Sequence, residues 1–178
     1  MDAQKENKNG LIGQIITYVF AALGLIITVI NMIAGGGNNL LAQILIAVIF
    51  ILIFIYAFTG YKKPHGNMLK WTMLLYAVLR VIAASQIIDK SFVVALPALS
   101  AICVAYMCGR LNKREKNLYW LYIAGALELI SAVIMVTNAS GFLDGLAMFT
   151  PLFGLIALFG AYFAKFEEHK NAGLSEEE

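Results

Sequence analysis

The chain has 178 residues, of which 61% are hydrophobic and 13% are charged, and its mean hydropathy is +0.79. Soluble domains are about 45–50% apolar and about 25% charged, and disordered chains are less hydrophobic still, so the composition excludes both classes. A net charge of +2 and two cysteines do not fit a strongly basic nucleic-acid-binding domain or a disulfide-rich scaffold. The class that remains is a polytopic integral membrane protein, whose first partner is the lipid bilayer.

Six apolar stretches follow one another along the chain, each near the roughly 20 residues that a helix needs to cross a bilayer core of about 30 Å. In chain order they are Leu11–Ala34, Leu40–Thr59, Met68–Ile88, Ser91–Cys108, Asn117–Asn138 and Leu143–Phe163. Residues 1–10 and 165–178 are left as charged tails. Residues 11–164 are therefore predicted to form one all-α domain, a six-transmembrane-helix bundle built as three tandem helical hairpins. Pro97 and Pro151 each remove one backbone hydrogen bond, so we expect kinks in the fourth and sixth spans.

The basic residues gather on one side of this predicted bundle. Lys90 alone lies on the other side, and Arg80 lies within the third span. The remaining eleven are Lys5, Lys8, Lys62, Lys63, Lys70, Arg110, Lys113, Arg114, Lys116, Lys165 and Lys170. Because cytoplasmic loops carry the excess of Lys and Arg, both termini are predicted to be cytoplasmic. The composition and small size favour a multi-pass protein of a bacterial inner membrane.

A repeated pattern of border residues divides the chain into hairpins of about 50 residues. Tyr56, Tyr106 and Tyr162 each lie near the cytoplasmic end of a hairpin, and Trp71 and Trp120 lie near the start of the next one. One interpretation is internal duplication. The other is that all hairpins of this orientation share basic, aromatic and small residues at their borders.

Arg80 and Glu128 are the two charged residues deep within predicted spans. They follow Trp71 and Trp120 by nine and eight residues, so they lie at a similar depth in two spans that run in the same direction. A charge at the centre of a membrane helix costs about 2.5–3.5 kcal/mol and normally finds a partner inside the bundle. We therefore hypothesise an Arg80–Glu128 ion pair. It either carries a proton or an anionic group, or fixes the register of packing.

Span one carries a stripe of small and polar residues on one helical face. Its members are Gln14, Thr17, Ala21, Gly24, Thr28 and Asn31. Small residues are common where membrane helices approach closely, so a packing seam is one interpretation. The other is one wall of a solvated cavity. Tyr76 lies one turn before Arg80 on the same helical face of the third span.

No catalytic signature is present in the sequence, whether for a metalloprotease, a phosphate-binding loop, a nucleophile elbow or a dinucleotide site. His65 and His169 each lack a second metal ligand nearby in the sequence, and Cys103 and Cys108 do not form a Cys-x-x-Cys motif. We therefore expect no enzyme activity, no metal, no cofactor and no nucleic-acid partner.

The buried charges, the polar stripe and the two proline-containing helices favour a small solute transporter or the membrane subunit of one. Its candidate ligand or ion-pair residues are Arg80, Glu128, Gln14, Thr17, Thr28, Asn31 and Tyr76. The alternative is a non-catalytic structural or accessory protein that packs against partner helices or lipids. The transport hypothesis predicts a small solute as ligand, and the alternative predicts a partner membrane protein.

Overall fold

The computed structural model describes residues 2–34, 40–60, 66–87, 91–110, 118–137, 139 and 141–174. Within these ranges the regular structure is entirely helical, which confirms the predicted all-α class. The helices are α1 (Asp2–Ala34), α2 (Leu40–Gly60), α3 (Gly66–Ile87), α4 (Ser91–Arg110), α5 (Tyr119–Val136), α6 (Phe142–Ala147) and α7 (Thr150–Leu174).

Six helical stretches in the described part of the chain are long and apolar enough to cross a membrane. They are Gly10–Ala34, Leu40–Thr59, Met68–Gln86, Val93–Arg110, Tyr119–Val136 and Phe142–Lys165. The expected six-helix membrane bundle is therefore confirmed, with borders within a few residues of those predicted. The predicted ends at Ile88, Asn117 and Asn138 lie outside the described residues.

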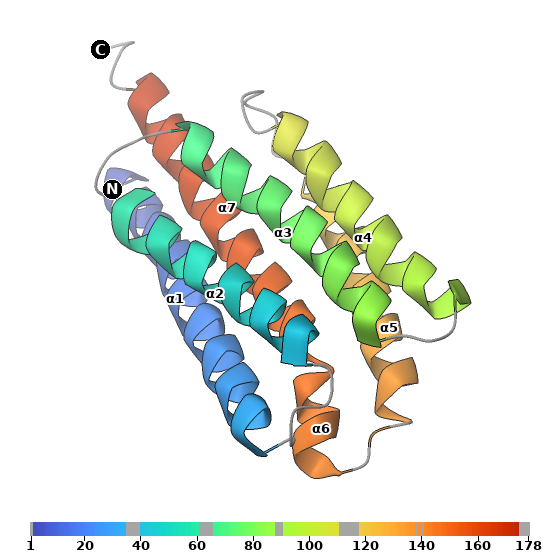
Figure 1. Ribbon diagram of the computed structural model, residues 1–178. Helices are drawn as coiled ribbons and strands as arrows, with labels where there is room; N and C mark the ends of the chain where they lie inside the picture. Colours follow the sequence, from blue (N-terminus) through green and yellow to red (C-terminus); the bar gives the residue numbers. More distant parts are fainter. Residues whose placement is uncertain are drawn as a thin grey trace.

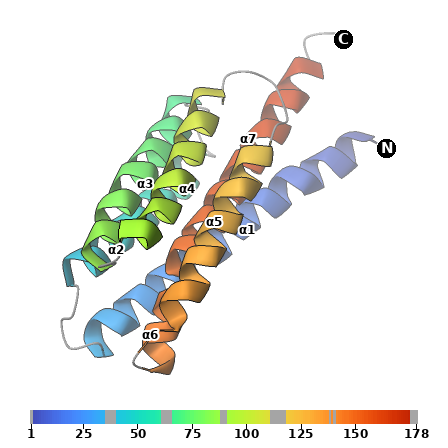
Figure 2. The ribbon, with the colours of Figure 1, turned by 90° about the vertical axis from the view of Figure 1, so that its right-hand side faces the viewer.

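The helices form two layers of three, which face each other (Figures 1 and 2). In one layer α3 lies between α2 and α4, and in the other α7 lies between α1 and α5. The layers meet along both edges, where α1 contacts α2 and α4 contacts α5, and in the centre, where α7 contacts α2 and α3. The short helix α6 lies against α1 and α5 at the end of the bundle away from the chain termini (Figure 1).

Bulky and small side chains are divided unequally between the layers. Nine of the twelve largest fully buried side chains of the described residues come from α2, α3 and α4. The facing layer contributes small residues instead, among them Ala21, Ala124, Ala157 and Ala161, each fully buried. Large side chains of the first layer therefore fill the space against a smoother second layer.

The outward faces of the helices are apolar. In α1 the residues Ile12, Ile15, Val19, Ile26 and Ile33 are exposed and recur at helical spacing. This pattern matches a helix whose outer side touches lipid tails, where no water is available to solvate polar groups.

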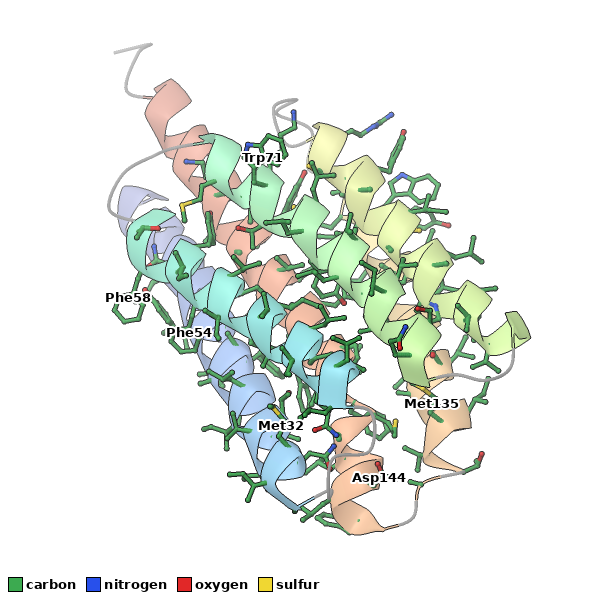
Figure 3. The ribbon with its side chains drawn as sticks, in the orientation of Figure 1. Met32, Phe54, Phe58, Trp71, Met135 and Asp144 are labelled. Carbon is green, nitrogen blue, oxygen red and sulfur yellow. The ribbon has the colours of Figure 1, made fainter. Side chains whose placement is uncertain are left out.

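Both chain ends lie at one end of the bundle (Figure 1). Lys70 and Arg110 belong to the ends of α3 and α4 on this side, where Trp71 also lies, whereas Asp144 lies at the opposite end (Figure 3). Six of the Lys and Arg residues used to predict the orientation lie outside the described residues, namely Lys62, Lys63, Lys90, Lys113, Arg114 and Lys116, and so does His65. The shared side of the termini agrees with six spans, and its assignment to the cytoplasm stays a prediction.

The sixth span is interrupted rather than kinked. Helix α6 ends at Ala147 and α7 begins at Thr150, because Pro151 has no N–H to donate to the carbonyl of Ala147. The hydroxyl of Thr150 donates to that carbonyl instead, with an Oγ1···O distance of 2.7 Å. In contrast, α4 runs without a break through Pro97. The two prolines thus have different effects: the helix breaks at residues 148–149, just before Pro151, and continues through Pro97.

The predicted tails and repeated tyrosines also differ in detail from the sequence pattern. Helix α1 begins at Asp2 and α7 continues to Leu174, so residues predicted as tails extend the first and last helices. Tyr56 and Tyr162 are buried, whereas Tyr106 is 43% exposed and packs edge-on against Trp120. The three tyrosines therefore lie in unlike environments, and internal duplication stays a hypothesis.

Candidate functional site

Arg80 of α3 and Glu128 of α5 form a buried, two-bonded ion pair. The Arg80 Nε donates to Glu128 Oε1 at 2.9 Å, and Nη2 donates to Oε2 at 2.7 Å. Each residue is only 1% exposed. Parallel N–H···O bonds of this kind are stronger and more directional than a single contact. The pairing predicted from the similar depth of the two residues is confirmed.

The pair joins the two layers of the bundle, because α3 and α5 belong to different layers. Small residues surround it on both helices: Ala83 and Ala84 on α3, and Ala124 and Ala132 on α5, are all buried. Small side chains at these positions leave room between the two helices for the long polar side chains of Arg80 and Glu128 to meet. The local sequence thus positions the pair by removing bulk around it.

Tyr76 links the neighbourhood of the pair to the start of α7. Its hydroxyl donates to the carbonyl oxygen of Pro151 at 3.1 Å. Its ring covers Gly154, where an added Cβ would lie 3.1 Å from Tyr76 Cε2. Tyr76 precedes Arg80 by one helical turn. Helix α3 therefore supplies one partner of the ion pair and also contacts the sixth span next to its interruption.

The Arg80 guanidinium keeps one edge that Glu128 does not use. A guanidinium carries five N–H groups, and Glu128 takes one from Nε and one from Nη2. The other three, two on Nη1 and one on Nη2, have no hydrogen-bond acceptor among the residues that the structure describes. This end-on edge is a planar fork of donors, the geometry that suits a carboxylate or another oxyanion.

Two buried serines lie at a similar depth to Glu128. Ser131 is one turn beyond Glu128 on the buried face of α5. Ser100 precedes the end of α4 at Arg110 by ten residues, and Glu128 follows the start of α5 at Tyr119 by nine. Because α4 and α5 are consecutive and antiparallel, these counts give Ser100 and Glu128 nearly the same height.

The hydroxyls of Ser100 and Ser131 have no hydrogen-bond partner in the described part of the chain, although both residues are fully buried. Buried polar groups are nearly always bonded, so such hydroxyls call for an explanation. Ser100 was not among the predicted site residues. The signal that could have indicated it is a serine halfway along a largely apolar span.

The polar stripe of α1 lies elsewhere, in the contact between α1 and its neighbours. Thr17, Thr28 and Asn31 are buried and Gln14 is half-buried. The hydroxyl of Thr17 donates to the Gly13 carbonyl at 2.9 Å, and that of Thr28 donates to the Gly24 carbonyl at 2.7 Å. These bonds within the helix satisfy both hydroxyls while the stripe packs against other helices.

The stripe is held by close contacts at glycines. A Cβ at Gly160 of α7 would lie 2.6 Å from the Gly13 carbonyl oxygen, and a Cβ at Gly13 would lie 2.7 Å from the Gly160 carbonyl oxygen. A Cβ at Gly24 would overlap the ring of Phe50, which comes from α2. We call the contact of α1 with α7 at Gly13 and Gly160 the glycine seam. It is separate from the site around Arg80.

The cysteines form no part of the Arg80 site. Cys103 and Cys108 are buried free thiols, and Cys108 Sγ donates to the Lys70 carbonyl at 3.2 Å. Among the described residues no group of three or more His, Cys, Asp or Glu side chains could hold a metal ion. No protein-family model, curated protein sequence or solved structure matches this chain.

Proposed function

We propose that this protein transports a small polar solute across a membrane, alone or as the membrane-embedded subunit of a transporter. The observation that carries the proposal is the donor edge that Glu128 leaves unused on Arg80, a residue that lies past the middle of α3 and is only 1% exposed. Polar groups inside membrane spans are expensive and mark solute or ion pathways more often than other positions. The binding site that we propose consists of Arg80 and Glu128, with Tyr76 beside it.

The interrupted sixth span supports this proposal. Transport proteins build their binding sites at membrane helices that break within the bilayer. Here the break at residues 148–149 lies between α6 and α7, and Tyr76 contacts the first turn of α7 through Pro151. A movement of α7 would therefore reach α3, which carries Arg80.

The two-layer arrangement supplies a way to expose the buried site. Apart from the pair itself, the centre of the interface between the layers consists of bulky side chains such as Phe50 and Tyr76 resting on Gly154. Besides the pair, the hydrogen bond from Tyr76 to the Pro151 carbonyl would have to break when the layers separate here. Rocking of the α2–α3–α4 layer against the α1–α7–α5 layer would open a route to Arg80 while each layer stays intact.

Native mass spectrometry tests the proposal on protein extracted gently from the cells that naturally make it. The wild-type chain should carry a stoichiometric small molecule. The matched control is the double variant Arg80→Gln/Glu128→Gln, which removes both charges and keeps a polar side chain at each position, and it should lose that molecule. A wild-type chain that carries only bulk lipid would contradict the proposal.

A structural or accessory role is the second candidate, and one observation favours it. Arg80 and Glu128 neutralise each other and are 1% exposed, which is what a device that fixes helix register requires. On this hypothesis the charged pair can be replaced by an apolar pair with no loss of function. A co-purifying membrane protein without a small ligand would identify this role.

We further propose that the end of the bundle with both termini faces the cytoplasm of a bacterial cell, in the inner membrane. Its support is the excess of Lys and Arg in the segments on that side, which the positive-inside rule assigns to the cytoplasm. Fusions to the C-terminus test it. A fluorescent reporter that folds only in the cytoplasm should be bright, and alkaline phosphatase, active only outside it, should be inactive.

A further inference from the structure

Charge balance limits what can bind at the free edge of Arg80. With Glu128 ionised, the pair is neutral, as a buried site must be to avoid a large desolvation penalty. An oxyanion on the free edge would leave one uncompensated negative charge inside the bundle. Uptake of one proton by Glu128 restores neutrality, because the site then holds one guanidinium, one neutral carboxylic acid and one anion.

The donors around the pair favour an oxyanion over a neutral solute. The free edge presents three N–H groups in a planar fork, and Ser100 and Ser131 add hydroxyls without a partner at a similar depth. A neutral polar solute brings donors as well as acceptors, and these need acceptors in the site. Each Glu128 oxygen already accepts one bond from Arg80, whereas the unused groups of Arg80 are all donors, because a guanidinium has no acceptor.

We propose that the free edge of Arg80 binds one small monovalent carboxylate and that Glu128 takes up one proton for each carboxylate bound. This inference rests on the proposed transport function and names its substrate class and coupling ion. In the empty site Glu128 is ionised and pairs with Arg80. In the loaded site the incoming carboxylate occupies the fork, and protonated Glu128 stays beside it as a neutral group that can donate one hydrogen bond.

We assign the proton to Glu128 after considering the titratable groups on the helices around it. Arg80 and Tyr76 of α3 are the charged and titratable groups that act on it electrostatically. On the buried face of α4 the titratable residues are Cys103 and Cys108, which lie nearer to the end with the termini. The buried titratable residues of α7 are Tyr162 and Lys165, which follow Pro151 by 11 and 14 residues and so lie further along α7 toward that end. Asp144 of α6 lies at the opposite end (Figure 3).

The test measures binding of formate, the smallest carboxylate, to the purified full chain by isothermal titration calorimetry, with sodium chloride holding ionic strength constant. Titrations in two buffers of different ionisation enthalpy count the protons taken up. We expect one proton per formate for the wild type. Because binding takes up a proton, the apparent Kd should rise as the pH is raised.

The Glu128→Gln variant is the matched comparison, because a neutral Gln resembles protonated Glu128. It should bind formate without proton uptake and with a Kd independent of pH, and formate should raise its Tm more than chloride does. The Arg80→Gln/Glu128→Gln variant should bind no formate. Ser100→Ala and Ser131→Ala should weaken formate binding several-fold and leave the proton count unchanged.

Two results would overturn the inference. One is the absence of formate binding to both the wild type and Glu128→Gln, and the other is wild-type binding without proton uptake. If native mass spectrometry then finds a neutral solute that depends on Arg80, the transport proposal stands and only the carboxylate assignment fails. If it finds no solute at all, both fail.

Discussion

The glycine seam and the Arg80–Glu128 pair hold the bundle together in opposite ways. At the seam, Gly13 and Gly160 bring two backbones together and leave no room for a single added carbon. At the pair, two long side chains extend from α3 and α5 and meet through two hydrogen bonds. The seam should therefore be sensitive to volume and indifferent to charge, and the pair should be sensitive to charge and tolerant of volume.

The same contrast distinguishes what each region can do. Backbone contact leaves α1 and α7 little freedom to separate, because close packing is lost over the whole contact at once. An ion pair can exchange partners, since a guanidinium offers a second edge to another acceptor. The seam is thus suited to a fixed frame, and the pair to a site whose occupancy changes.

The largest expected effect is the loss of one charge of the pair. Glu128→Gln leaves Arg80 charged and buried without a carboxylate, and breaking such pairs costs about 3–5 kcal/mol in soluble proteins. The free energy of unfolding, measured by circular dichroism in mixed micelles of dodecylmaltoside and sodium dodecyl sulfate, should fall accordingly. The charge exchange Arg80→Glu/Glu128→Arg should recover part of this loss. An exchange no more stable than the single change would show that the two residues do not act as a pair.

The next largest effect is expected at the seam. In Gly160→Ala the new Cβ would lie 2.6 Å from the Gly13 carbonyl oxygen, so α1 and α7 must move apart. Overpacking of this kind costs about 1–3 kcal/mol. Gly125→Ala is the control, because an added Cβ there meets nothing within 4 Å, and it should be neutral or slightly stabilising. Equal losses for the two variants in the same unfolding assay would contradict a backbone contact.

A smaller effect is expected where Phe50 covers Gly24. Gly24→Ala should destabilise by about 1 kcal/mol, because a ring can shift more easily than a backbone. Phe50→Leu removes the overlapping ring atoms, so the double variant should lose less than the sum of the two single losses. A double-mutant cycle measures this coupling, and strict additivity would mean that the two residues do not touch.

The smallest effect is expected for Tyr76→Phe, which removes the hydroxyl that donates to the Pro151 carbonyl. A hydrogen bond of this kind contributes about 0.5–1.5 kcal/mol. Because the ring stays in place over Gly154, the loss of unfolding free energy should not exceed this range. A larger loss would indicate that Tyr76 also supports the adjacent Arg80.

The features that the sequence predicted are those that depend on counting along one helix. Apolar run lengths predicted the six spans, and equal distances from Trp71 and Trp120 predicted that Arg80 and Glu128 would meet. Features that depend on the register between helices were not predictable. The position of Phe50 in the sequence does not indicate that its ring will lie over Gly24, because that contact depends on the register between α1 and α2.

Pro151 shows the same limit within one helix. The residue predicts a missing hydrogen bond, but whether the helix bends or breaks depends on its neighbours. Here Thr150 takes the released carbonyl and the helix breaks, whereas at Pro97 it continues. The free edge of Arg80 was unpredictable for another reason, since which edge of a guanidinium a carboxylate uses is decided by side-chain geometry.

The order of the charges along the chain has a consequence for synthesis of the protein. Arg80 precedes Glu128 by 48 residues, so α3 leaves the ribosome before its partner α5 exists. At about 5–20 residues per second, Arg80 waits roughly 2–10 s for its carboxylate. During that delay the helix carries an insertion penalty of about 2.5–3.5 kcal/mol. We expect α3 to remain beside the insertion machinery until α5 arrives, so that the second and third hairpins enter the membrane together.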